Sequence, residues 1–237
     1  MTQPSTPAQK FDPLRAGEYQ TQSRIALAGY DACHDLAACM IAASLGNPAQ
    51  AHMLIVGAGG GGQEIVAANR LGPDWHFTAV DPSPPMMDLA VEQLTQAGLA
   101  ARTHFHLGYV DDLPEGQQFD AATLIGVLHH QPGDEAKQRL LASIADRLAP
   151  GAPLIVAGNR LAYAEHPLLL SAWGERWRMH GATAEEVHAK LGKILEGADP
   201  PASEETVAQL LSEAGFGQPT WFFSSLFWGA CLARRQG

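Results

Sequence analysis

The stretch that decides the fold is Leu54-Ile55-Val56-Gly57-Ala58-Gly59-Gly60-Gly61-Gly62-Gln63-Glu64. Its apolar start predicts a buried strand, and a helix is expected to begin near Gln63. Glycine lets the backbone turn tightly and approach a ligand closely, and a helix N-terminus offers unbonded N–H groups. A tight strand-to-helix turn without a ligand is the alternative. The entropic cost of so many consecutive glycines favours a ligand-binding loop.

Asp81 ends the next predicted strand, about 24 residues after Gly57. In a nucleotide-binding α/β unit, an acidic residue at this distance accepts hydrogen bonds from the ribose hydroxyls. The alternative is a turn or helix-capping residue ahead of Pro82. Together, the glycine loop and this acid indicate an adenosine-containing ligand, which includes both NAD and S-adenosylmethionine.

The rest of the chain alternates strand-like apolar runs with helical patterns, which is typical of a doubly wound, mostly parallel sheet. We expect further strands at 76–80, 103–107, 121–125 and 154–157, and helices at 31–45, 86–96, 134–148 and 203–214. One or two inserted helices are expected within about 161–201. The runs at 220–223 and 227–233 predict a terminal hairpin.

The overall composition is ordinary for a globular protein: 237 residues, 46% hydrophobic and 17% charged. We expect a flexible tail over residues 1–20 and a single domain over 21–237. The formal net charge of −10 argues against nucleic acid or acidic lipid as the main partner, because polyanions bind basic surfaces. Three cysteines without metal-ligand spacing, and the lack of a membrane-helix or signal-peptide pattern, predict a cytoplasmic protein without a metal site.

Further segments of the sequence distinguish between NAD and S-adenosylmethionine as the expected cofactor. They are Val80-Asp81-Pro82-Ser83-Pro84-Pro85-Met86-Met87, Gly108-Tyr109-Val110-Asp111-Asp112-Leu113-Pro114 with Phe119-Asp120, and Gly126-Val127-Leu128-His129-His130. With the glycine loop, in this order, they resemble the class I S-adenosylmethionine-dependent methyltransferases over roughly residues 24–235. The resemblance implies a Rossmann-like methyltransferase fold, with a seven-stranded sheet, a terminal antiparallel hairpin and a small helical lid. It also implies S-adenosylmethionine as cofactor, S-adenosylhomocysteine as product and a small-molecule acceptor.

The resemblance assigns roles to single residues. Gly57, Gly59 and Gly61 would line the methionine and ribose part of the cofactor, and Asp81 would hold the ribose hydroxyls. Met86 would pack on the adenine face, its alternative being a core position of its helix. The other positions expected at the cofactor are Ala58, Pro82, Tyr109, Val110, Ile125 and Gly126.

Two positions depart from the family pattern, since Ile55 and Tyr109 stand where acidic residues are usual.

The stretches 24–35 and 214–232 also resemble the bacterial enzymes of carboxymethoxyuridine formation at the tRNA wobble position. That likeness implies that Tyr30 caps the cofactor site, with a packing role as the alternative. Those enzymes bind the extra carboxylate of carboxy-S-adenosylmethionine with an arginine. The corresponding stretch, 188–195, holds none, so ordinary S-adenosylmethionine is expected.

His129 and His130 follow the fourth predicted strand and are candidate general bases for a hydroxyl acceptor, with His130 preferred. A purely structural role for the pair is the alternative. The inserted segment would close an acceptor pocket, lined by Tyr163, His166, Trp173, Arg176, Trp177 and Arg178. The two tryptophans are four residues apart and share a helix face, so they either contact the acceptor or dock the insertion onto the core.

Methyl transfer to a small molecule is therefore the function that the sequence favours. A tRNA-modifying enzyme of the wobble-uridine pathway, an NAD-dependent oxidoreductase and a non-catalytic S-adenosylmethionine-binding protein are the alternatives. The missing arginine and the acidic charge speak against the first of these, and the terminal hairpin speaks against the second. Ile55 and Tyr109 keep the third open. A homodimer formed through the lid is a further expectation.

Overall fold

The computed structural model describes residues 21–60 and 62–237. The expected tail, residues 1–20, and Gly61 lie outside the described residues. The strands are β1 (His52–Val56), β2 (His76–Asp81), β3 (Thr103–Leu107), β4 (Ala121–Ile125), β5 (Pro153–Asn159), β6 (Thr220–Ser225) and β7 (Trp228–Arg234). The longer helices are α3 (Tyr30–Leu45), α4 (Gln63–Asn69), α5 (Pro84–Gln96), α6 (Gly133–Asp146), α7 (Pro167–Met179), α8 (Ala184–Gly197) and α9 (Glu204–Glu213).

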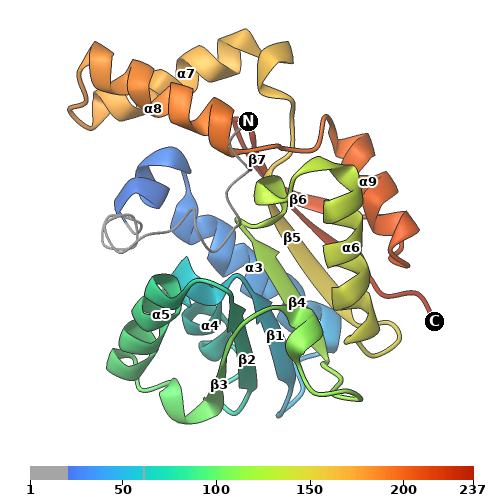
Figure 1. Cartoon of the computed structure of the whole chain (residues 1–237). Helices are drawn as coiled ribbons and strands as arrows, with labels where there is room; N and C mark the ends of the chain where they lie inside the picture. The colour runs from blue at the N-terminus through green and yellow to red at the C-terminus, as the bar shows by residue number, and fades with distance from the viewer. Residues whose placement is uncertain (1–20, 61) are drawn as a thin grey trace.

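The seven strands form one sheet in the order β3-β2-β1-β4-β5-β7-β6 (Figure 1). Strands β1 to β5 pair in parallel, and β7 runs antiparallel to both β5 and β6. The predicted fold class, with its terminal hairpin, is confirmed. The second strand of the hairpin, β7, lies next to β5, an order that the sequence pattern did not specify.

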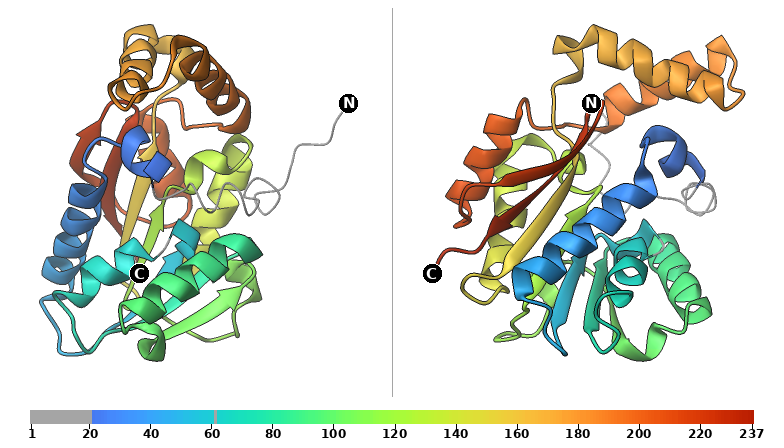
Figure 2. Two further views of the ribbon diagram at one scale, coloured as in Figure 1. Left: turned by 90° about the vertical axis from the view of Figure 1, so that its left-hand side faces the viewer. Right: turned by 180° about the vertical axis from the view of Figure 1, so that it is seen from behind.

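Strand β1 is buried on both faces, as expected for a central parallel strand. Met53 and Ile55 contribute to one apolar core beneath α3, α4 and α5, and Leu54 and Val56 contribute to the other beneath α6 and α9. Figure 2 shows these two layers on opposite sides of the sheet. Burying an aliphatic side chain of this size contributes roughly 1.5–3 kcal/mol, so the continuous apolar run fixes β1 at the centre of the molecule.

Most predicted elements differ from the observed ones by only a few residues, and the differences have local causes. Helix α5 begins at Pro84, two residues before the predicted start, because proline is accommodated in the first helical turn. Ser203 caps α9 by accepting the N–H of Thr206 at 3.2 Å. Within the described residues, no helix is long and apolar enough to span a bilayer.

The inserted segment forms two helices, α7 and α8, which lie across the carboxyl end of the sheet (Figures 1 and 2). A third apolar cluster joins them to the body and includes Tyr163, Trp173, Trp177 and Phe227. The indole N–H of Trp173 donates to the carbonyl oxygen of Ala26 at 2.7 Å. Both tryptophan side chains are therefore used to dock the helices onto the rest of the chain.

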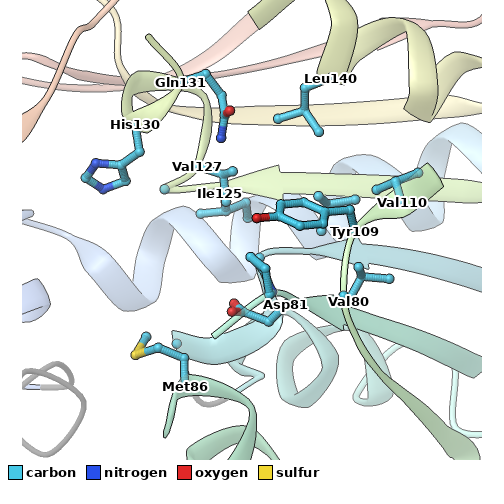
Figure 3. A pocket seen from close by; sticks show the side chains of 16 residues that line it. Val80, Asp81, Met86, Tyr109, Val110, Ile125, Val127, His130, Gln131 and Leu140 are labelled. Atoms are coloured by element: carbon cyan, nitrogen blue, oxygen red, sulfur yellow. The ribbon is translucent and has the colours of Figure 1, made fainter. Parts of the chain in front are cut away.

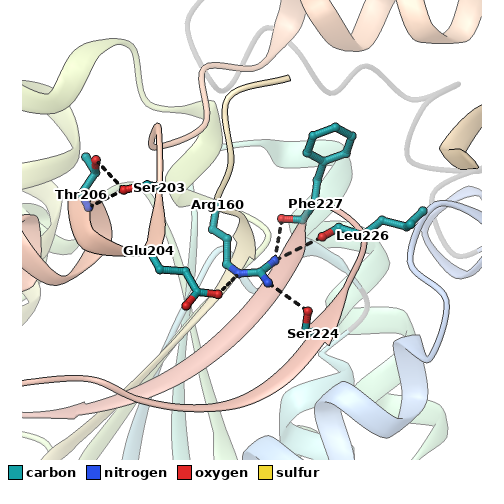
Figure 4. A network of polar contacts seen from close by, with 7 residues as sticks. All are labelled: Arg160, Ser203, Glu204, Thr206, Ser224, Leu226 and Phe227. Atoms are coloured by element: carbon teal, nitrogen blue, oxygen red, sulfur yellow. Dashed lines mark hydrogen bonds and ion pairs between the residues drawn. The ribbon is translucent and has the colours of Figure 1, made fainter. Parts of the chain in front are cut away.

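Arg160, directly after β5, connects this end of the sheet to the hairpin (Figure 4). Its buried guanidinium donates to Glu204 Oε1 at 2.7 Å and to Ser224 Oγ at 2.9 Å. It also donates to the carbonyl oxygens of Leu226 and Phe227 in the hairpin turn, at 3.3 and 3.1 Å. These bonds satisfy all three guanidinium nitrogens and hold Phe227 beneath α7.

At the opposite end of the sheet, His52 lies beside other histidines. His52 pairs with His76 across β1 and β2, and its Nε2 lies 2.9 Å from Thr78 Oγ1. Burial lowers the pKa of the His52 imidazole below its usual 6.5, His76 and His104 act in the same direction, and Asp120 opposes the shift. The folded protein therefore disfavours a proton on this ring.

We expect the free energy of unfolding to fall as the pH is lowered through this region. Unfolded His52 takes up a proton near pH 6.5, whereas folded His52 does so only at lower pH. The stabilisation is present above the unfolded pKa and is lost as the pH falls through the folded pKa. Urea unfolding between about pH 7.5 and 5.5 should show a smaller pH dependence for His52→Gln. His188→Gln, on an exposed ring, is the control, and equal slopes for the two variants would contradict this account.

Candidate functional site

The glycine loop leaves β1 through a conformation that a side chain would prevent. Gly57 has φ +79°, and a Cβ added there would lie 2.1 Å from Val127 Cγ2. Its N–H donates to the carbonyl oxygen of Val80 at 2.8 Å, which joins the ends of β1 and β2. The loop continues through the short 3-10 helix η1 (Ala58–Gly60) to Gly62, which has φ +65° and precedes α4. Glycine at both positions is thus a steric requirement.

Asp81 ends β2 and is only 8% exposed. Its Oδ2 accepts the N–H of Gly59 at 3.0 Å, and its Oδ1 accepts the N–H of Ser83 at 2.8 Å. Burial raises the pKa of the Asp81 carboxyl above its usual value, and these two hydrogen bonds oppose the shift. The carboxyl group is thereby held in one orientation and projects into the cavity (Figure 3).

The cavity lies at the carboxyl ends of β1, β2 and β4 and encloses about 730 Å³ of space, some of it open to solvent. The sheet order reverses between β1 and β4, because β2 and β3 extend to one side and β5 to the other. In open α/β sheets, ligands bind in the crevice at such a switch point. The residues that line the cavity are Val56, Gly57, Gly60, Val80, Asp81, Pro82, Met86, Gly108, Tyr109, Val110, Ile125, Gly126, Val127, His130, Gln131 and Leu140.

Most residues predicted to contact a cofactor lie in this lining. They are Gly57, Asp81, Pro82, Met86, Tyr109, Val110, Ile125 and Gly126. Ala58 and Gly59 are buried in the loop beside the lining, where Gly59 contacts Asp81. Tyr30 lies in the first turn of α3, with its ring 4.3 Å from that of His34 and under the Arg24 guanidinium. It is not among the lining residues.

Several lining residues were not predicted from the sequence. They are Val56, Gly60, Val80, Gly108, Val127, Gln131 and Leu140. The valines and Leu140 have the pattern of ordinary core positions of a strand or helix, so no local signal marks them. Gly108, next to the predicted Tyr109, has φ +156°, and a Cβ there would lie 2.9 Å from Asp112 Oδ2. A glycine after a strand and before acidic residues was a usable signal for Gly108, and the glycine run was one for Gly60.

The two candidate bases occupy different environments. His130 ends the short helix η4 (Leu128–His130) and lines the cavity. His129 is buried, with its ring 5.6 Å from that of Trp228, and a Cβ at Gly158 would lie 2.8 Å from its Nδ1. Only His130 among the two is therefore placed to reach a ligand in this cavity.

The residues expected to line an acceptor pocket divide into two groups. Tyr163, Trp173 and Trp177 pack in the cluster beneath the lid, and the hydroxyl of Tyr163 accepts a hydrogen bond from Asn159 at 2.8 Å. Burial raises the pKa of Tyr163 well above its usual value, so its hydroxyl stays protonated. The ring of His166 lies 6.3 Å from that of Phe227 at the margin of the cluster.

The two arginines of α7 have other partners. Arg176 donates to the carbonyl oxygen of Ile25 at 3.1 Å, and Arg178 is exposed and pairs with Glu175 at 3.1 Å. None of the predicted acceptor-pocket residues lines the cavity at the switch point. Among the described residues, no three His, Cys, Asp or Glu side chains are grouped so that they could hold a metal ion.

Comparison with known proteins agrees with this geometry. Residues 53–151, from β1 to the turn before β5, match the model of the methyltransferase domain family. A segment of 82 residues, 34% of this chain, is 38% identical to an uncharacterised protein of Synechococcus and covers 19% of that protein. The matched segment contains the glycine loop and Asp81, which border the cavity.

Solved structures share the fold over most of the chain. A candidate O-methyltransferase from Nostoc punctiforme is 16% identical, with a TM-score of 0.67, over 94% of this chain and 61% of that one. Human N-acetylserotonin methyltransferase, in complex with S-adenosylmethionine, is 19% identical, with a TM-score of 0.60, over 94% and 57%. The dimethyltransferase RosA from Streptomyces davawensis is 21% identical, with a TM-score of 0.56, over 78% and 49%. This chain spans about half to three fifths of their length and has the class I methyltransferase fold.

Gly59→Ala tests the tight packing of the loop against Asp81. The added Cβ would lie 2.3 Å from Met86 Cβ and 2.6 Å from Asp81 Oδ2. We expect the melting temperature to fall by about 5 °C or more, because the loop must shift and break a buried hydrogen bond. Gly192→Ala, in α8, is the control, since its Cβ would meet nothing within 4 Å. Calorimetry that gave the two variants equal melting temperatures would refute this packing.

Proposed function

We propose that this protein binds S-adenosylmethionine in the cavity at the switch point and transfers the methyl group to a small-molecule acceptor. The observation that carries the proposal is the buried Asp81 carboxyl, which the N–H of Gly59 orients beside the glycine loop. A carboxylate in this place accepts hydrogen bonds from the hydroxyls of a ribose. The match of residues 53–151 to the methyltransferase domain model supports methyl transfer as the chemistry.

The chain offers matching surfaces for each part of this cofactor. Asp81 would hold the ribose, and the backbone of Gly57 and Gly60 would border the methionine part. Val110 is the first residue of the short helix η3 (Val110–Asp112), so its N–H is not used within that helix and is available to the base. The absence of a side chain at Gly59 leaves room for Asp81 and Met86, which border the ribose position.

The sulfonium, when bound, supplies an electrophilic methyl group, so the chain itself has to position the acceptor and exclude water. We propose that His130 removes the proton from a hydroxyl acceptor. A neutral imidazole accepts a proton at physiological pH. The position of His130 after Gly126, at the end of β4, supports this role, since this edge of the cavity lies opposite the ribose position.

A small molecule is the acceptor class that we propose. The human and Streptomyces proteins with this fold are named for methyl transfer to N-acetylserotonin and to an amino-demethyl riboflavin. The aromatic cluster beneath α7 and α8 supports a lid that shields the acceptor from water. A cytoplasmic location stays a prediction, which the three free cysteines support. A homodimer also stays a prediction.

Isothermal titration of the purified protein with S-adenosylmethionine, S-adenosylhomocysteine and NAD tests the proposal. We expect micromolar binding of the two sulfur nucleotides and none of NAD. Asp81→Ala should weaken both by about 100-fold, because two hydrogen bonds to a charged group are lost. Asp74→Ala, on an exposed side chain, is the matched control. Absence of binding to either sulfur nucleotide would overturn the proposal.

A further inference from the structure

Gln131 lies on the wall of the cavity that faces Asp81. Its N–H donates to the carbonyl oxygen of Leu128 at 3.1 Å, and its half-buried side chain lines the cavity. In Figure 3 its amide points from the loop toward the middle of the cavity, beside Leu140. Nothing in residues 21–60 and 62–237 forms a hydrogen bond with this amide. One acceptor and two N–H donors are therefore available to a ligand.

The loop that carries Gln131 is held by contacts to Asp199, which pairs with a buried lysine. Lys137 of α6 is 1% exposed, and its Nζ lies 2.9 Å from Asp199 Oδ2, in the segment that leaves α8. The same oxygen accepts the N–H of Gly133 at 2.6 Å, and the N–H of Asp199 donates to the carbonyl oxygen of His129 at 2.8 Å. Both sides of Gln131 are thus fixed, which lowers the entropic cost of presenting its amide to a ligand.

The space between Gln131 and Asp81 is bordered by apolar side chains. They are Val80, Val110, Val127 and Leu140. A nucleoside with its ribose on Asp81 and its 5′ end toward the glycine loop has its base in this apolar part of the cavity. A purine suits such a place, because its faces are apolar and its hydrogen-bonding groups lie along one edge.

We propose that Gln131 recognises the adenine edge of the nucleoside, an inference that rests on the proposed function. Oε1 accepts a hydrogen bond from the 6-amino group, and Nε2 donates to the neighbouring ring nitrogen. A side-chain amide pairs well with adenine, since the base presents a donor and an acceptor side by side. Gln131 is then a specificity-determining residue for the cofactor and takes no part in the transfer step.

A cycle that combines a protein variant with a ligand variant tests this contact. The probes are S-adenosylhomocysteine and its analogue in which hydrogen replaces the 6-amino group, titrated into the whole protein and into Gln131→Leu. In the unsubstituted protein we expect loss of the amino group to weaken binding about tenfold. In Gln131→Leu, which already lacks the hydrogen-bond acceptor, we expect removal of the amino group to weaken binding by less than about twofold.

Two further variants keep the result interpretable. Gln118→Leu, on an exposed side chain, should behave as the unsubstituted protein, and Gln131→Glu, which keeps the acceptor, should keep part of the amino-group preference. If the preference is the same in the unsubstituted protein, Gln131→Leu and Gln131→Glu, then the inference is wrong while the cofactor site stands. If the unsubstituted protein does not bind S-adenosylhomocysteine at all, the proposed function fails, and this inference fails with it.

Discussion

The hydrogen bond from the Gly59 N–H to the Asp81 carboxylate is the contact on which the rest of the site depends. It joins the loop after β1 to the end of β2. The two groups approach so closely that a Cβ at position 59 would overlap the carboxylate. Parallel strands place these two ends at the same edge of the sheet, and burial of β1 on both faces keeps them there. The apolar core therefore brings Asp81 and the glycine loop together, and the hydrogen bonds then set the orientation of the carboxyl group.

The wall opposite Asp81 depends on a different set of contacts. The ion pair of Lys137 and Asp199 ties the loop after β4 to the segment that leaves the lid. Arg160 binds the hairpin turn and places Phe227 beneath α7. Lys137 and Arg160 are buried cations with several partners, and removing such a partner is costly because it leaves a buried charge less well paired. The lid and the cavity wall are thus parts of one connected structure.

Sequence patterns predicted the strands best where turns flank them. The predicted strands 103–107 and 121–125 coincide with β3 and β4. They also predicted the side of the cavity that directly follows strand ends, including Gly57, Asp81 and Val110. On the opposite wall His130 was predicted, but Gln131 was not, because its sequence context is that of an ordinary polar loop and only tertiary packing brings it to the cavity. For Trp173 the sequence left docking and acceptor contact open, and it did not identify the docking partner, Ala26, because that contact joins distant parts of the chain.

The central claim is that a nucleoside of the cofactor lies between Asp81 and the wall that carries Gln131. A crystal structure of the protein with S-adenosylhomocysteine tests it most directly. The account predicts both ribose hydroxyls on the Asp81 carboxylate, with the base among Val80, Val110 and Leu140. Density for the nucleoside at any other place, with the cavity at the ends of β1, β2 and β4 left empty, would contradict it.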